Sequence, residues 1–276
     1  MIQLLSDAFN NWLRHRTTRL GAALAYYSVF SLGPLLLIVT AVAGLFFGAE
    51  AVRGSISTQF RELLGPTGSQ AIEAMLKGAA SSTSGGWTAL SGIVLLLIAA
   101  LGVVVQLKDA LNTIFETQEP ETAGFAWYAR VYAVSFAGVL SLGFLLAVSL
   151  VISTALAAIS AWFGQSLTNQ ALMAGINFAV SLAVLSGVFA MLFKWFPDRP
   201  MAWRAVWPGA IATALLFNIG KAAIAWYIGT QGLESTYGAA ASIVVLLVWV
   251  YYSAQIVLFG AELTHAYAER IRKGQR

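Results

Sequence analysis

Two apolar runs, residues 207–228 and 239–263, constrain the fold of this chain more than any other feature. Each run exceeds the roughly 20 residues that a helix needs to cross a bilayer. Within hydrocarbon, only helices and closed barrels satisfy their own backbone hydrogen bonds. A short segment, residues 229–238, joins the two runs. We therefore predict a helical hairpin that crosses the membrane twice.

Four more apolar segments continue this pattern along the chain. Of the 276 residues, 59% are hydrophobic and only 10% are charged. The mean hydropathy is +0.76, which is more apolar than a soluble domain of this length tolerates. We predict an all-α integral membrane protein with a single membrane domain over residues 1–276. Its six predicted transmembrane helices cover about residues 20–48, 87–107, 131–163, 172–196, 207–228 and 239–263.

Two segments outside the spans also have helical patterns. In residues 1–19, apolar side chains recur at helical spacing and basic residues follow them, which predicts an amphipathic helix. This helix lies either in the membrane interface or against the bundle, and we expect no chemistry from it. Residues 49–86 lie between the first two spans, on the extracytoplasmic side. Their pattern predicts two short helices with a break at Gly65 and Pro66.

Gly33 and Pro34 interrupt the first span near its middle. Pro34 has no backbone N–H to donate to the carbonyl of Phe30, and its ring clashes there, so we expect the helix to kink or break. In transporters, broken helices expose carbonyl groups and half-helix ends that bind ions or polar groups. Proline is also common in ordinary membrane helices, so a purely structural role stays open.

The basic residues predict the orientation of the chain in the membrane. Six spans put both ends of the chain on one side, together with the loops that follow the second and fourth spans. Twelve of the 16 lysines and arginines lie on that side, three lie in residues 49–86, and one, Lys221, lies inside a span. Because Lys and Arg accumulate in cytoplasmic loops, we predict that both termini are cytoplasmic.

The third and fourth spans carry signals for contact between helices. In the third span a small residue recurs every four positions from 149 to 161, which is typical of closely packed membrane helices. The fourth span holds Asn177 and Ser181 one turn apart. We expect these two side chains to be able to hydrogen-bond to a neighbouring helix.

The last two spans carry polar side chains that are unusual in hydrocarbon. Asn218 and Lys221 lie one turn apart on the first of them, and Tyr251, Gln255 and Glu262 share one stripe of the second. A charge inside the membrane costs at least a few kcal/mol, so it usually faces a partner, water or a cavity. We therefore predict a polar site inside the bundle.

Antiparallel pairing of the last two spans gives a first estimate of which of these residues meet. It predicts that Lys221 lies nearer residues 242–248 than Glu262, too far from Glu262 for an ion pair. A structural alternative stays open for each residue. The stem of Lys221 reaches the outer headgroups by snorkelling, and Glu262 occupies a cytoplasmic interface position.

Catalytic and cofactor motifs are absent from the sequence. His15 and His265 lie near cytoplasmic ends of predicted helices, and no cluster of His, Asp and Glu has metal-ligand spacing. Glycine motifs that bind nucleotides are absent, and the chain has no cysteine. We expect no enzymatic activity, no cofactor and no metal. The basic residues do not gather into a nucleic-acid-binding face.

Five short motifs occur in order along nearly the whole chain. They are ALAYYS at 23–28 followed by Pro34, LNTIF at 111–115, Tyr237-Gly238, WVYYS at 249–253 and GAEL at 260–263. In these motifs the chain resembles the YihY/virulence factor BrkB family. The resemblance implies a bacterial inner-membrane protein with six helices, a fold largely its own, and a role in transport or export, including of lipids. An earlier label for the family, ribonuclease BN, is regarded as mistaken, and this chain has no nuclease site.

The leading hypothesis is an inner-membrane transporter or exporter of lipids or of other amphipathic or anionic small molecules. The candidate residues of its polar cavity are Tyr26, Tyr27, Asn218, Lys221, Tyr237, Tyr251, Gln255 and Glu262. Membrane lipids are the expected partners, nucleic acid is not, and a homo-oligomer is compatible with the pattern. The alternative is a non-transporting scaffold or envelope-interaction protein that acts through residues 49–86.

Overall fold

The computed structural model describes residues 2–81, 102–117, 167–198, 201–230 and 241–274. Within these ranges the regular structure is entirely α-helical. The helices are α1 (Ile2–Arg14), α2 (Thr17–Phe47), α3 (Ala49–Ser81), residues 102–114, α6 (Leu167–Trp195), α7 (Trp203–Thr230) and α9 (Ala241–Gly274). The predicted all-α class is therefore confirmed for the described residues. The predicted third span and most of the second lie outside them.

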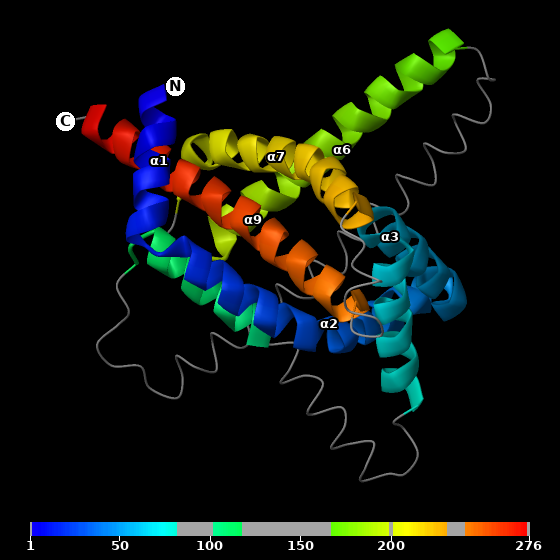
Figure 1. Ribbon diagram of the computed structural model, residues 1–276. Coiled ribbons are helices and arrows are strands. Elements are labelled where there is room, and N and C mark those ends of the chain that lie inside the picture. Colours follow the sequence, from blue (N-terminus) through cyan, green and yellow to red (C-terminus); the bar gives the residue numbers. More distant parts are fainter. Residues whose placement is uncertain (1, 82–101, 118–166, 199–200, 231–240, 275–276) are drawn as a thin grey trace.

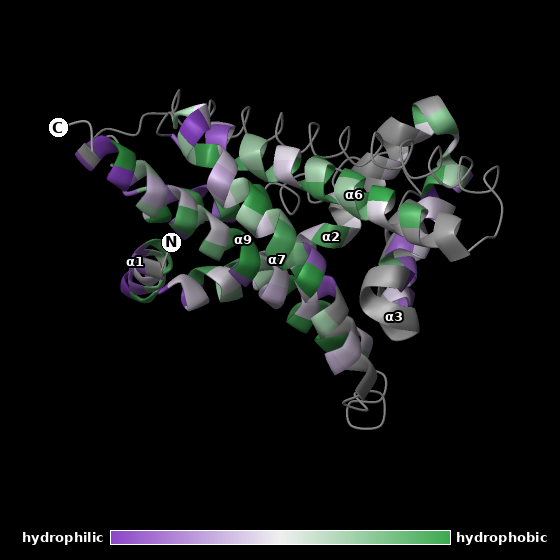
Figure 2. Ribbon diagram, turned by 90° about the horizontal axis from the view of Figure 1, so that it is seen from above, coloured by the Kyte–Doolittle hydropathy of each residue, from purple (hydrophilic) through white to green (hydrophobic). Residues whose placement is uncertain are grey.

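The long helix α9 lies at the centre of the arrangement. It contacts α1, α2, α3 and α7, and Figure 1 shows it running between α7 and α2. Because α1 packs against the C-terminal part of α9, both ends of the chain lie at one end of the bundle, which we call the terminal end. Hydrophobic residues cover much of α7 and α9, while hydrophilic residues gather where α9 reaches the terminal end (Figure 2).

Two of the described helices contain segments long and apolar enough to cross a membrane. One segment, Phe178–Trp195, lies in α6, and the other, Ala241–Lys273, makes up almost all of α9. In both segments only 22% of the residues are buried inside the protein. Apolar surface that the protein leaves uncovered needs another apolar environment, and a bilayer supplies it. The structure thus supports a helical membrane protein, while the count of six spans stays a prediction.

Small residues bring α7 and α9 together. A side chain at Gly209 would overlap Thr264, and one at Gly260 would overlap Thr213, so each glycine accommodates a threonine of the other helix. The threonine hydroxyls donate to carbonyls of their own helices, Thr213 to Gly209 at 2.7 Å and Thr264 to Gly260 at 2.9 Å. Their polar groups are therefore satisfied inside the apolar contact.

This packing sets the register of the hairpin. Gly220 lies directly against Tyr252 and Ile256 of α9. Its neighbour Lys221 is therefore level with Tyr252, about one turn from residue 248 and nearly three turns from Glu262. Lys221 thus lies nearer residues 242–248 than Glu262, as predicted. The glycines fix this register, because they allow the two backbones to approach closely.

The first span was predicted to kink or break at Gly33 and Pro34, and it does not break there. The helix α2 continues through Gly33 and Pro34 from Thr17 to Phe47. A proline removes only one backbone hydrogen bond, and membrane helices tolerate this where their surroundings compensate for the freed group. The half-helix ends expected at this position are therefore not formed.

The segment that follows, α3, was predicted as two short helices, and it is helical without interruption from Ala49 to Ser81. It nevertheless folds back on itself. The hydroxyl of Ser57 donates to Glu73 over 2.6 Å, although residues 16 positions apart would lie about 24 Å apart on a straight helix. The bend between them includes the predicted break at Gly65 and Pro66, which agrees with proline as a common cause of sharp bends.

Apolar residues of α3 pack into the bundle. Its fully buried Ile72 joins Leu36 of α2 and Val245 and Leu246 of α9 in one core cluster, and Ile56 and Phe60 pack against this cluster. A larger cluster joins α2, residues 102–114, α6, α7 and α9 through Leu24, Leu111, Ile114, Phe115, Phe189, Phe193, Val206 and Leu258. The helix at residues 102–114 therefore continues beyond residue 107, the predicted end of the second span.

The amphipathic N-terminal helix is also present, as α1. It docks through Ala8, which is buried against Leu263 and Ala266 of α9. Its opposite side leaves Leu5, Phe9 and Leu13 about half exposed. One face of α1 thus contacts the bundle, while the other presents the apolar stripe expected of an interfacial helix.

Candidate functional site

A buried carboxylate is the most unusual feature of the terminal end. The side chain of Glu262 in α9 is 0% exposed. Its Oε1 lies 2.9 Å from Nδ1 of His15 and accepts a hydrogen bond from the hydroxyl of Thr17 at 3.1 Å. Its Oε2 is also buried and has no hydrogen-bond partner among the described residues. A buried polar atom without a partner costs about 1–3 kcal/mol, so this oxygen requires an explanation.

The connection between α1 and α2 brings His15 to this carboxylate. Arg16 adopts a left-handed backbone conformation with φ of 52°, and the chain changes direction there. His15 is consequently turned inward, with its side chain only 10% exposed. Thr17, the first residue of α2, is fully buried beside it. The chemistry at Glu262 therefore depends on the α1–α2 corner.

The second ring nitrogen of His15 faces another carboxylate. Its Nε2 lies 3.6 Å from Oε1 of Glu116, which follows the helix at residues 102–114. The same oxygen of Glu116 forms an ion pair with Arg14 at 2.6 Å. The Glu116 side chain is 49% exposed, in contrast to Glu262. The imidazole of His15 thus stands between an exposed carboxylate and a buried one.

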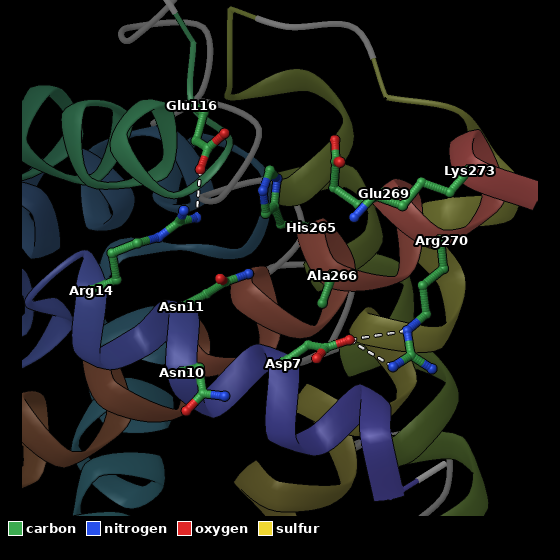
Figure 3. A pocket seen from close by; sticks show the side chains of 10 residues that line it. All are labelled: Asp7, Asn10, Asn11, Arg14, Glu116, His265, Ala266, Glu269, Arg270 and Lys273. Carbon is green, nitrogen blue, oxygen red and sulfur yellow. Dashed lines mark hydrogen bonds and ion pairs between the residues drawn. The ribbon is translucent and has the colours of Figure 1, made fainter.

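Glu116 also lines a pocket at the terminal end, with a volume of about 340 Å³. Figure 3 shows this terminal pocket with side chains from α1, from Glu116 and from the last turns of α9. They are Asp7, Asn10, Asn11, Arg14, Glu116, His265, Ala266, Glu269, Arg270 and Lys273. Ion pairs hold its rim, Asp7 with Arg270 and Arg14 with Glu116, both at 2.6 Å. The terminal pocket is therefore a polar cavity next to the buried pair of Glu262 and His15.

His265 connects the pocket with the buried site from the α9 side. It lies one turn beyond Glu262, is 4% exposed, and lines the terminal pocket. Its ring centroid is 6.4 Å from that of His15 and 6.2 Å from that of Phe115. Both histidines of the chain therefore meet at this end of the bundle.

Gln255 lies two turns before Glu262 on the same face of α9. Its amide nitrogen and oxygen are both buried and, within the part of the chain that the structure describes, have no hydrogen-bond partner. The side chain lies directly against Gly21 of α2, where any larger residue would overlap the amide. The predicted stripe is therefore partly confirmed, because Gln255, Leu258 and Glu262 all face the interior, whereas Tyr251 is 37% exposed.

The other predicted candidates lie apart from this site. Asn218 accepts a hydrogen bond from Ser181 at 3.3 Å and donates to the carbonyl of Ala214, so it joins α6 to α7. This bond confirms the expectation for Ser181. Lys221 is half-buried and, within the described residues, takes part in no hydrogen bond or ion pair; the structure does not bring it to Glu262.

The tyrosines are also separate from the Glu262 site. Tyr26 and Tyr27 are 60% and 43% exposed on α2. Tyr27 lies against Gly102, at the start of the helix at residues 102–114. Tyr237 lies outside the described residues.

The partner of Glu262 was not predicted from the sequence. The structure buries Glu262 completely and gives it His15 of the α1–α2 corner as a partner. Neither periodicity nor spacing could have paired residues so far apart in the chain. The only signal in the sequence was a glutamate in an apolar run, which implies that some partner exists.

A second buried charge was also missed by the sequence analysis. Lys108, 5% exposed, pairs with Asp198 at 2.9 Å. Asn112 donates to the Asp198 carboxylate at 2.8 Å and accepts from its backbone N–H at 2.9 Å. These bonds fasten the helix at residues 102–114 to the end of α6. We interpret this cluster as structural, because every member has a partner.

The described residues offer no group of three or more His, Asp or Glu side chains that could hold a metal ion.

The chain is similar to one family model and to several known membrane proteins. The family model described as Virulence factor BrkB matches residues 8–276. A UPF0761 membrane protein of Pseudomonas aeruginosa (strain LESB58) is 27% identical over 262 residues, covering 92% of this chain and 61% of the relative. Another, of Pseudoalteromonas translucida (strain TAC 125), is 30% identical over 247 residues, covering 87% of this chain and 78% of the relative.

A third UPF0761 membrane protein, of Methylibium petroleiphilum, is 29% identical over 284 residues, covering 97% of this chain and 65% of the relative. The chain therefore spans less than two thirds of the length of several relatives that it matches. None of these three names describes an enzyme. No solved structure gives a significant match.

Proposed function

The chain belongs to the virulence factor BrkB family, a family of membrane proteins, and we propose that it is a transporter or exporter of the bacterial inner membrane. Its substrate class is lipids or other amphipathic or anionic small molecules. The substrate passes along the polar face of α9 that carries Gln255 and Glu262. We also propose that the chain crosses the membrane six times with both termini in the cytoplasm. The terminal pocket then opens on the cytoplasmic side.

The observation that carries this proposal is the buried amide of Gln255. An amide has two donors and two acceptor positions, and in this side chain both polar atoms are enclosed without a partner. If Gln255 only filled space, a leucine would do so without the desolvation cost of about 1–3 kcal/mol. A substrate with hydroxyl, phosphate or carboxylate groups would satisfy the amide as it passes. The glycine at position 21 leaves room for the amide against α2.

Glu262 supports the same proposal from the next polar position on this face. Ionisable residues within membrane segments commonly mark substrate or ion pathways. Here the pathway would begin at the polar terminal pocket, pass the His15 and Glu262 pair, and continue to Gln255. The exposed tyrosines of α2 and Lys221 of α7 lie elsewhere, so they would act at other positions along the route.

The alternative role as a scaffold acting through residues 49–86 has less support. Apolar residues of α3, including Ile72, Ile56 and Phe60, pack on α2 and α9. They are therefore engaged within the protein and are not free to bind a partner. The scaffold hypothesis requires that residues 49–86 present an exposed apolar surface to a partner.

The proposal is tested with purified protein in proteoliposomes that contain fluorescent phosphatidylglycerol or fluorescent phosphatidylcholine. Bleaching of the outer leaflet by dithionite reports how fast each probe crosses the membrane. We expect wild type to move phosphatidylglycerol faster than protein-free vesicles do, and Gln255→Leu to lose most of this gain. The control is Gln70→Leu, which makes the same change at an exposed position of α3.

Two results would count against transport of lipids along this face. One is a rate in wild-type vesicles equal to that of protein-free vesicles for both probes. The other is undiminished movement by Gln255→Leu at equal abundance of folded protein. Equal rates for the two probes would show that the headgroup charge is not recognised.

A further inference from the structure

The geometry of the terminal end points to a proton relay from Glu116 through His15 to Glu262. We infer that this relay carries protons between the terminal pocket and the interior of the bundle, and that it couples transport to a proton gradient. The inference deepens the proposed function and rests on it. It assigns a role to the one described histidine that contacts carboxylates on both of its ring nitrogens.

Three distances define the relay. Nδ1 of His15 lies 2.9 Å from Oε1 of Glu262, within hydrogen-bond reach. Nε2 of the same ring lies 3.6 Å from Oε1 of Glu116, which lines the pocket. Such a separation is slightly longer than a hydrogen bond, and Nη2 of Arg14 lies 3.5 Å from the same ring nitrogen. The imidazole is thus the only described side chain that touches both carboxylates.

The transfer balances at each atom. His15 starts as a neutral imidazole with its proton on Nδ1, donated to the Glu262 carboxylate. A proton from the pocket, delivered by Glu116 or by water beside it, binds Nε2 and makes an imidazolium. The ring then releases the Nδ1 proton to Glu262, which becomes a neutral carboxylic acid, and the imidazole keeps the proton on Nε2. The reverse order returns the proton to the pocket.

The environment of Glu262 fits a group that alternately binds and releases a proton. Thr17 donates to Oε1 and so fixes the oxygen that faces His15. Oε2 has no fixed partner, whereas a purely structural buried carboxylate is usually bonded at both oxygens. Two turns further along this face, Gln255 supplies the next polar group. An amide both donates and accepts, so it can exchange partners with a carboxyl group or a substrate in either protonation state.

Charged and titratable groups surround the relay on several elements. The α1–α2 corner contributes Arg14 and His15, and residues 102–117 contribute Glu116. On α9, His265 lies beside the His15 ring. The pocket at Glu116 is also lined by Asp7 of α1 and by Glu269, Arg270 and Lys273 of α9. On its α7 side this part of α9 packs against Gly209 and Thr213, which do not titrate. Arg14 holds Glu116 in an ion pair and so keeps the entrance of the relay next to the His15 ring.

The test follows the protonation of Glu262 directly, in the full chain in lipid nanodiscs. Infrared difference spectroscopy on protein with isotope-labelled glutamate detects a protonated carboxyl group, and Glu262→Gln assigns the band. We expect a Glu262 band that grows as the pH falls and that exchanges hydrogen for deuterium rapidly. His15→Asn keeps a donor beside Glu262 but cannot relay a proton, so we expect exchange to slow about 100-fold. Glu116→Gln should slow it as well.

The infrared test has one control variant and two results that would overturn the relay. Glu50→Gln, an exposed glutamate of α3, should leave the band and its exchange unchanged. Absence of a Glu262 carboxyl band at every pH at which the protein stays folded would overturn the relay. Exchange at the wild-type rate in both His15→Asn and Glu116→Gln would overturn it equally.

A second measurement separates failure of the relay from failure of the proposed function. In the proteoliposome assay, an imposed pH gradient should change the rate of phosphatidylglycerol movement by wild type and not by Glu262→Gln. If wild type moves phosphatidylglycerol at the same rate with and without the pH gradient, proton coupling is rejected and lipid transport is retained. A titrating Glu262 without any movement of either probe would reject lipid transport and leave the relay standing.

Discussion

At the residue scale, Glu262 meets its two partners across 247 and 245 positions of the chain. Its position in an apolar run predicts that it needs a partner, since a lone carboxylate there is costly. The identity of the partner depends on how α1 and α2 turn beside α9, which a pattern along the chain does not encode. The same holds for Lys108 and Asp198, whose pairing joins two segments that have the whole predicted third and fourth spans between them.

The pair of Lys108 and Asp198 gives a stability prediction. Asp198→Ala removes the ion pair and both bonds to Asn112, and leaves the buried ammonium of Lys108 unpaired. We expect the free energy of unfolding to fall by about 2 kcal/mol. Adding Lys108→Met should recover much of this loss, because an apolar side chain needs no partner there. Denaturation in mixed micelles measures both, and equal stabilities of the double and single variants would contradict the account.

Lys221 gives a functional prediction at the same scale. Lys221→Met keeps the length and apolar bulk of the stem and deletes the charge. If the ammonium attracts anionic substrates along the route, movement of phosphatidylglycerol in proteoliposomes should fall severalfold while movement of phosphatidylcholine stays unchanged. Protein abundance in the membrane should be preserved, because removing a half-buried charge relieves a desolvation cost. Unchanged movement of both probes would remove Lys221 from the site and favour snorkelling.

At the element scale, apolar run length predicts the long helices well. The predicted fifth span, 207–228, lies inside α7, and the predicted sixth, 239–263, overlaps α9, which extends eleven residues further, to Gly274. The extension was missed because its residues are polar, although they remain good helix formers and α1 packs against them. The helix α2 continues through Gly33 and Pro34, whereas α3 folds back over a stretch that contains Gly65 and Pro66. Glycine and proline therefore mark positions where a helix can change course without determining whether it does.

The reciprocal contacts of glycine and threonine between α7 and α9 make a prediction about packing. Gly260→Ala places a methyl group against Thr213, whose short side chain cannot move away. We expect a loss of about 1–3 kcal/mol in the free energy of unfolding. Gly187→Ala in α6 is the matched control, because a methyl group there meets nothing within 4 Å. The control should be neutral or stabilise the helix by up to about 1 kcal/mol, and comparable losses in both variants would contradict the role of Gly260.

At the scale of the whole molecule, orientation in the membrane is the next prediction. The chain has no native cysteine, so single substitutions can be labelled cleanly. A cysteine at the exposed Gln70 of α3 should react with a membrane-impermeant maleimide added to intact cells. Cysteines at the exposed Thr113 and Lys273 should react only after the membrane is permeabilised. Labelling of position 273 in intact cells would reverse the orientation.

The central claim, that the polar face of α9 receives a ligand, is tested most directly by cryo-electron microscopy of the full chain in nanodiscs containing phosphatidylglycerol. The account predicts density for a lipid headgroup or solute within about 3 Å of the Gln255 amide, together with His15 and Thr17 bonded to Glu262. An amide of Gln255 enclosed by apolar side chains without such density, or bonded to another side chain of the bundle, would contradict it.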